Sequence, residues 1–145
     1  MNYIRKIGLL LIILFISCKS NEIKIQKWKE GIIDSEGLYI DKMSQWKLKV
    51  YRDDGLLKYF VYEGKDTVIR SNENISAYQN WYFYVDSNKN LWIESSDVGP
   101  WVWIKQANYK YSRFEINNIP LNVTIPKAFY QRLPKSFQKR IKKLI

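Results

Sequence analysis

Histidine is absent from this chain of 145 residues, and cysteine occurs only once, as Cys18. The first absence removes the commonest general base and the commonest metal ligand in proteins. The second excludes an internal disulfide and any zinc site built from several cysteines. An enzyme would depend on Asp, Glu, Ser, Lys or Tyr, and no pair among the 14 acidic residues stands out by its spacing. We therefore expect a protein that is not an enzyme and that needs no cofactor or metal.

Negative charge is missing from the end of the chain, where no acid follows Glu115. The whole chain carries 24 Lys and Arg against 14 Asp and Glu, which gives a net charge of +10. Residues 127–145 contain seven of the basic side chains, whereas residues 18–126 hold 15 basic and 14 acidic ones. The basicity is therefore a property of the tail and not of the whole chain.

Long apolar runs are also missing, because the longest one covers only residues 7–16. Ten residues are half of the roughly 20 that a membrane-spanning helix needs. Arg5 and Lys6 precede the run, and the small residue Ser17 follows it. A charged start, a short apolar middle and a small residue at the end indicate a secretory signal peptide.

The residues at the end of this run carry a resemblance to a known class of proteins. Phe15-Ile16-Ser17-Cys18 resembles the lipobox of bacterial lipoproteins, in the relaxed form of Bacteroidetes-type lipoproteins that accepts Phe where Leu is usual. The resemblance implies cleavage before Cys18, lipidation of Cys18 and a membrane anchor in the bacterial cell envelope. Lys19 implies sorting to the outer membrane. Two or three acyl chains would hold the protein stably, since each buried CH₂ contributes about 0.8 kcal/mol.

The remainder suits one domain rich in aromatic residues, with 11 Tyr, 6 Trp and 6 Phe. We divide the chain into a signal peptide at residues 1–17, a polar tether at 18–29, a β domain at 30–124 and a basic helical tail at 125–145.

Alternation of apolar and polar residues is clearest in residues 45–52, where Trp46, Leu48 and Val50 share one face. Period two is typical of a half-buried strand, and the turn at 53–55 makes residues 45–63 a hairpin. Turn residues separate further short runs, which predict strands at 37–40, 67–70, 78–85, 91–94, 101–106 and 109–116. We predict a mainly β fold, an antiparallel meander of about seven to eight strands with a short basic C-terminal helix, and both a small barrel and a sandwich fit it.

The sequence of the tail predicts a helix, because Pro126 suits a first helical position. Pro134 either ends this helix or begins a second one. Phe137, Ile141 and Leu144 form an apolar stripe. Basic residues surround this stripe and are candidates for contact with an anionic membrane: Lys135, Lys139, Arg140, Lys142 and Lys143. The alternative is that the stripe packs on the sheet. Nucleic acid is not an expected partner of a lipid-anchored envelope protein.

Residues 84–103 are rich in aromatic side chains and also contain three acids. These acids, Asp86, Glu94 and Asp97, suggest a metal or carboxylate site. A calcium loop needs a longer series of oxygen ligands and a distal Glu. No such Glu falls in register, so we interpret residues 86–90 as a hairpin turn.

Five aromatic residues between positions 81 and 103 are candidates for a platform that binds sugar or protein: Trp81, Tyr82, Tyr84, Trp101 and Trp103. Tyr and Trp are enriched at interface hot spots, but core packing explains the same pattern.

Two functions remain open. The first is a lipid-anchored binding protein, such as an immunity or inhibitor protein with an unidentified protein partner. The second is a structural or assembly lipoprotein that binds lipid or a membrane complex. An apolar cavity would favour the second, and a filled core with exposed aromatic residues would favour the first.

Overall fold

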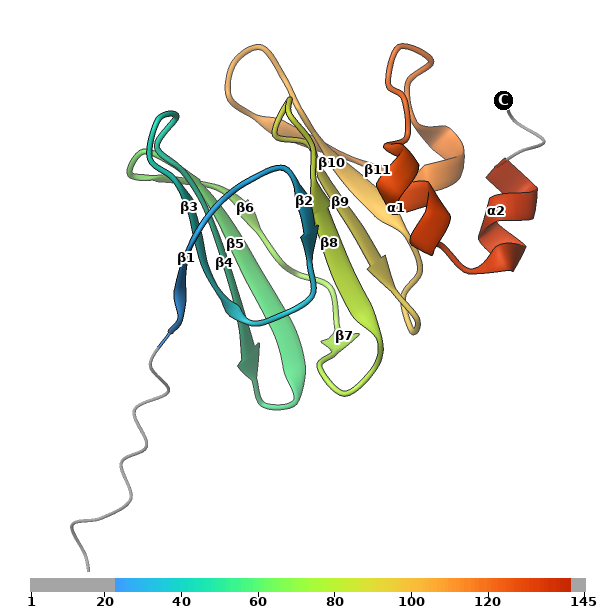
Figure 1. Cartoon of the computed structure of the whole chain (residues 1–145), viewed down its shortest axis with the longest axis horizontal. Coiled ribbons are helices and arrows are strands. Elements are labelled where there is room, and N and C mark those ends of the chain that lie inside the picture. Colours follow the sequence, from blue (N-terminus) through green and yellow to red (C-terminus); the bar gives the residue numbers. More distant parts are fainter. Residues whose placement is uncertain (1–22, 142–145) are drawn as a thin grey trace, which may run out of the picture.

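The computed structural model describes residues 23–141. The predicted signal peptide, Cys18, Lys142 and Lys143 lie outside the described residues. The described chain is mainly β, as predicted, with eleven strands in two sheets followed by two short helices (Figure 1). The predicted number of seven to eight strands is wrong.

Sheet A has the strand order β1-β3-β4-β5-β6, and β7 also pairs with β5. Its strands are β1 (Ile25–Lys27), β3 (Gly37–Asp41), β4 (Trp46–Asp53), β5 (Leu56–Glu63), β6 (Asp66–Arg70) and β7 (Ile75–Ser76). Sheet B has the order β11-β10-β9-β8-β2. Its strands are β2 (Gly31–Ile33), β8 (Trp81–Val85), β9 (Leu91–Ser95), β10 (Trp101–Lys105) and β11 (Tyr111–Glu115). All pairs are antiparallel except β1 with β3.

The two sheets face each other across the main core and do not close into a barrel. Trp46, Leu48 and Val50 of β4 point into this core, each at most 1% exposed, which confirms the predicted face. Phe83 of β8 and Trp101 of β10 meet them from sheet B and are fully buried. Large rings and aliphatic side chains from both sheets fill the space between them.

The hairpin at residues 45–63 is confirmed as β4 and β5, with Asp53 opposite Leu56. Asp54 and Gly55 form its two-residue turn with φ values of 46° and 74°. Two successive positive φ values are typical of the type I′ turn, whose twist matches that of paired strands. A side chain at Gly55 would also meet the ring of Tyr78, since its Cβ would lie 3.2 Å from that ring.

Helices α1 (Lys127–Arg132) and α2 (Lys135–Ile141) cover the face of sheet B that points away from sheet A (Figure 1). Phe129 of α1 is fully buried, and its ring centre lies 5.5 Å from that of Tyr82 and 5.6 Å from that of Trp92. Pro126 and Pro134 precede the two helices as predicted. The described residues thus form three layers, and none of them adds a further layer to the outer face of sheet A (Figure 1).

Strands β1, β2 and β7 were missed by the sequence analysis because they contain only three, three and two residues. A period of two cannot be recognised over so few positions. Strand β1 lies inside residues 18–29, which we predicted to be a polar tether. It forms because Ile25, Gln26 and Lys27 pair with β3, which no local pattern indicates.

Candidate binding surface

The five aromatic residues proposed as a platform do not lie on one surface. Trp81 and Trp103 are half-buried against the core between the sheets, and Trp101 is fully buried there. Tyr82 and Tyr84 lie on the opposite side of sheet B, in the core under the helices, and are 9% and 7% exposed. Alternation along β8 explains this division, because successive side chains of a strand point to opposite faces.

Three of these rings, those of Tyr82, Tyr84 and Trp103, donate hydrogen bonds inside the protein, whereas the indole of Trp101 is buried without a partner among the described residues. The Oη of Tyr84 donates to Glu30, and the Nε1 of Trp103 donates to the Oη of Tyr59, each over 3.0 Å. Burial is the main cause that raises the pKa values of Tyr59, Tyr82 and Tyr111 well above the ordinary value for tyrosine. These phenols therefore remain neutral and act as hydrogen-bonding groups.

A different aromatic surface is exposed on the outer face of sheet A. The registers of β3 to β6 bring side chains that point away from the core into adjacent positions, such as Lys49 opposite Phe60 and Phe60 opposite Arg70. We name this surface the basic–aromatic face. It consists of Lys27, Lys47, Lys49, Tyr51, Lys58, Phe60, Tyr62 and Arg70.

Three rings form the centre of the basic–aromatic face. Tyr51 and Phe60 stack with ring centres 5.9 Å apart and planes inclined by 16°, and Tyr62 lies 6.1 Å from Phe60. The Nζ of Lys49 lies 4.9 Å from the ring centre of Tyr51, and the guanidinium of Arg70 lies 5.4 Å from that of Phe60. Cations placed over ring faces hold both groups in position.

The charge of this face has one sign, because five of its side chains are basic. Among the strands β1, β3, β4, β5 and β6, alternation directs one acid to the outer face, and this is Asp53 at the end of β4. A rigid sheet with aromatic rings surrounded by cations suits an anionic, partly apolar partner. Such a surface can bind a partner by shape and charge.

The acids of the predicted hairpin turn have structural partners. Asp86 accepts four hydrogen bonds of 2.9 Å, from the backbone amides of Asn88 and Asn90, the side chain of Asn90 and the indole of Trp92. This confirms the interpretation of residues 86–90 as a turn between β8 and β9. Within residues 23–141, no group of three potential ligands is suited to a metal ion.

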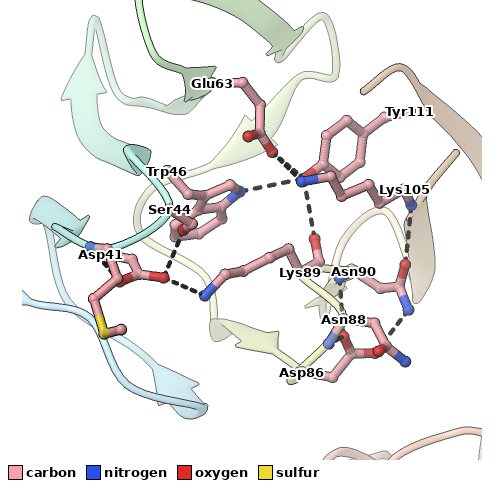
Figure 2. Close-up of polar contacts among 11 residues, drawn as sticks. Asp41, Ser44, Trp46, Glu63, Asp86, Asn88, Lys89, Asn90, Lys105 and Tyr111 are labelled. Atoms are coloured by element: carbon pink, nitrogen blue, oxygen red, sulfur yellow. Dashed lines mark hydrogen bonds and ion pairs between the residues drawn. The ribbon is translucent and has the colours of Figure 1, made fainter. Parts of the chain in front are cut away.

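The same turn connects the two sheets at one end of the domain (Figure 2). Lys89 of the turn forms an ion pair with Asp41 of sheet A, and Lys105 of β10 forms one with Glu63 of β5, both at 2.7 Å. The Oη of Tyr111 lies between them, within hydrogen-bonding distance of Glu63 and of the carbonyl of Lys89. We assign a structural role to this network, because its charges are paired with one another.

The described part of the basic tail has apolar residues that pack on the domain and basic residues that are exposed. Ile141 is 2% exposed and Phe137 is half-buried against the core under the helices, so these two residues of the predicted apolar stripe pack on the domain. Leu144, the third residue of the stripe, lies outside the described residues. Lys135, Lys139 and Arg140 are exposed on α2. In the part of the chain that is described, no helix is long and apolar enough to cross a membrane.

The sequence contained a partial signal for the basic–aromatic face. Alternation at residues 45–52 placed Lys47, Lys49 and Tyr51 together. Their position next to Phe60 and Arg70 depends on the register between strands. That register shifts between β5 and β6, at Val61 and Tyr62, and the sequence does not indicate this shift.

Comparisons with family models, with curated proteins and with solved structures found no match to this chain.

Proposed function

We propose that this protein is a lipid-anchored, non-enzymatic binding protein of the bacterial cell envelope. In this proposal Cys18 carries the lipid, and the basic–aromatic face binds an acidic surface of a protein partner. The observation that carries the binding part is the uncovered face itself, with three adjacent rings and five basic side chains on one rigid sheet. Its specific form is an immunity or inhibitor protein.

The position of the anchor supports this proposal. Ile23 is the first described residue, five positions after Cys18, and β1 begins two residues later in sheet A. Five residues span at most about 18 Å. An anchored domain would therefore stay close to the membrane, which favours capture of a partner that reaches or crosses that membrane.

Charge limits the kind of partner. A surface with five basic groups attracts an acidic protein and repels a cationic one, mainly through the rate of association. A lysozyme-like basic enzyme is therefore disfavoured. The rings of Tyr51, Phe60 and Tyr62 would supply the apolar contact area on which stable interfaces depend.

The alternative, an assembly lipoprotein that binds lipid, would be favoured by an apolar cavity inside a closed barrel. The two sheets are not closed, and the side chains of both fill the core between them, with Trp46, Trp101 and Phe83 fully buried. This arrangement supports the binding protein over the lipid carrier.

The anchor is tested in a bacterial host that processes lipoproteins. We expect the wild-type chain to incorporate a fatty-acid label and to fractionate with membranes, because acyl chains hold it there. Cys18→Ser should incorporate no label and should leave the membrane fraction. Ser17→Ala is a matched control that keeps the small residue before the cysteine. Membrane association and processing that are unchanged by Cys18→Ser would contradict the proposal.

The face is tested by charge reversal in the membrane-bound protein. We expect cross-linking in intact membranes to capture an acidic partner, and Lys49→Glu with Lys58→Glu to abolish that capture. The control pair Lys110→Glu and Lys127→Glu changes charge equally on exposed residues outside sheet A and should keep the partner. A partner retained by the first pair, or a basic partner, would contradict the assignment of this face.

A further inference from the structure

Glu94 is a buried carboxylate in the middle of a sheet. It belongs to β9, pairs in register with Tyr82 of β8 and is 4% exposed. Alternation places it on the face of sheet B that carries Tyr82 and Trp92, under the helical layer. Ionisable side chains are rarely buried at such positions unless a partner compensates for the lost hydration.

The structure gives Glu94 no such partner. Within residues 23–141, neither a hydrogen bond nor an ion pair reaches its carboxyl, and no cation lowers its pKa. The nearest basic residue of the surrounding layer, Arg132 at the end of α1, forms an ion pair with Asp34 at 3.6 Å. The guanidinium of Arg132 also lies 5.7 Å from the ring centre of Tyr82.

A cleft opens beside Glu94 between the start of β8 and the connection from α1 to α2. Its volume is about 330 Å³, and Glu94 lines it together with Trp81, Tyr82, Asn80 and Ser96. Asp34 and Arg132 border the same cleft. The carboxyl of Glu94 and the ring of Tyr82 therefore border a space that a small group can enter.

The local charge of this cleft differs from that of the whole chain. Asp34 borders it, and Asp97, which follows β9, lies near enough to Glu94 to act on its ionisation. Arg132 is the one basic residue in the lining. A positively charged group in the cleft would find the carboxylate of Glu94, which has no partner among residues 23–141, and the nearby ring of Tyr82, both of which attract cations.

We propose that this cleft binds an organic cation, either an alkylammonium or a guanidinium group, through a charge-assisted hydrogen bond to Glu94. Tyr82 contacts the carbon chain of the ligand, and Asn80 and Ser96 offer polar contacts at the rim. The cation is either a free amine or a Lys or Arg side chain of a protein. This site lies on sheet B and is independent of the basic–aromatic face on sheet A.

Ionisation of Glu94 gives the site a characteristic pH dependence. Burial, and secondly the charge of Asp97, raise the pKa of Glu94 above the ordinary value for glutamate. The groups that face it are Tyr82 from β8, Asp97 after β9, Arg132 at the end of α1 and Asp34 at the cleft border. Binding of a cation requires the ionised carboxylate, so affinity should rise as the pH rises through the pKa of Glu94.

The test follows the ring signals of Tyr82 by NMR in the full-length protein, labelled at tyrosine and purified in detergent. Agmatine, butylamine and Nα-acetyl-lysine amide serve as cationic probes, and sorbitol serves as a neutral one. We expect all three cations to shift the Tyr82 signals saturably, and Glu94→Gln to weaken binding about tenfold or more. Tighter binding of the lysine amide than of butylamine would indicate a protein side chain as the source, and the reverse order a free amine.

Glu115→Gln is the matched control, because Glu115 is exposed and lies outside the cleft. Unchanged indole signals of the six tryptophans in Glu94→Gln show that the variant is folded. Equal binding of sorbitol, equal affinity in Glu94→Gln, or no response of Tyr82 to any cation would overturn the proposal.

Discussion

Lys89 and Asp41 join the two sheets through an ion pair, with the Nζ of Lys89 2.7 Å from Oδ2 of Asp41. The side chains are only 12% and 17% exposed. The same Nζ lies 3.0 Å from the ring centre of Trp28, so the cation is held on two sides. This pair differs from an ordinary surface ion pair, whose contribution to stability is small.

Asp41→Asn should destabilise the domain in a pH-dependent way. The hydrogen bond from Lys89, and then that from Ser44, lower the pKa of Asp41 from 3.8 to about 2. An acid whose pKa falls on folding stabilises the protein above its unfolded pKa, and that stabilisation is lost as the pH falls towards about 2. We expect the variant to lose about 1 kcal/mol at neutral pH.

Urea denaturation across a pH series measures this loss. Asp53→Asn, an exposed acid on the same sheet, should change the free energy of unfolding little at any pH. A loss from Asp41→Asn that stays constant down to pH of about 2 would show that ionisation of Asp41 is not its cause.

Asp86→Ala should destabilise the domain by about 3 kcal/mol, because it removes the acceptor of four hydrogen bonds. The indole of Trp92 and the amide of Asn90 are buried and would lose their partner. Thermal unfolding measures the effect, and Ser87→Ala, at the exposed neighbour, serves as the control. Equal stability of the two variants would contradict the structural role of Asp86.

Phe129→Ala should cost about 3–5 kcal/mol, since it leaves a cavity where a fully buried ring meets Tyr82 and Trp92. Gln131→Ala, at an exposed position of the same helix, should change the free energy of unfolding by less than about 0.5 kcal/mol. Chemical denaturation compares them. A small effect of Phe129→Ala would indicate that the helical layer is not part of the cooperative unit.

Deletion of residues 135–145 distinguishes the two interpretations of the tail, which are packing on the domain and contact with an anionic membrane. Ile141 and Phe137 belong to the core under the helices, so we expect the truncated protein to unfold at lower temperature and to bind a hydrophobic dye. A truncated protein that keeps its melting temperature but loses contact with anionic vesicles would favour a membrane-surface helix instead.

Glu94→Gln should stabilise the protein, increasingly as the pH rises. Burial, then Asp97, raise the pKa of Glu94, so its ionised form opposes folding. The penalty is absent below the unfolded pKa of glutamate and grows until the pH exceeds the folded pKa. Melting temperatures of the two proteins should therefore converge in acid and separate at neutral pH. A gap that is the same in acid and at neutral pH would contradict this.

Local sequence determined the β4–β5 hairpin, because alternation fixes the buried face and Asp54-Gly55 fixes the turn. It also determined that the 86–90 segment is a turn, but it left open whether Phe137 and Ile141 pack on the domain or face a membrane, which the structure decided. The hairpin and the turn follow from neighbours in the chain, to which period and turn chemistry respond. The proposed anchor is likewise inferred from adjacent residues, those of the lipobox-like segment at 15–18.

Tertiary structure alone decided which aromatic rings are exposed. Trp101 and Tyr51 are both aromatic residues of strands, yet the first is fully buried and the second lies on an uncovered face. Exposure depends on what covers each face of a sheet, and that is set by the helices packing on sheet B and not on sheet A. The lack of a partner for Glu94 within residues 23–141 has the same origin, because a missing partner is a property of the space around a side chain and leaves no trace in the sequence.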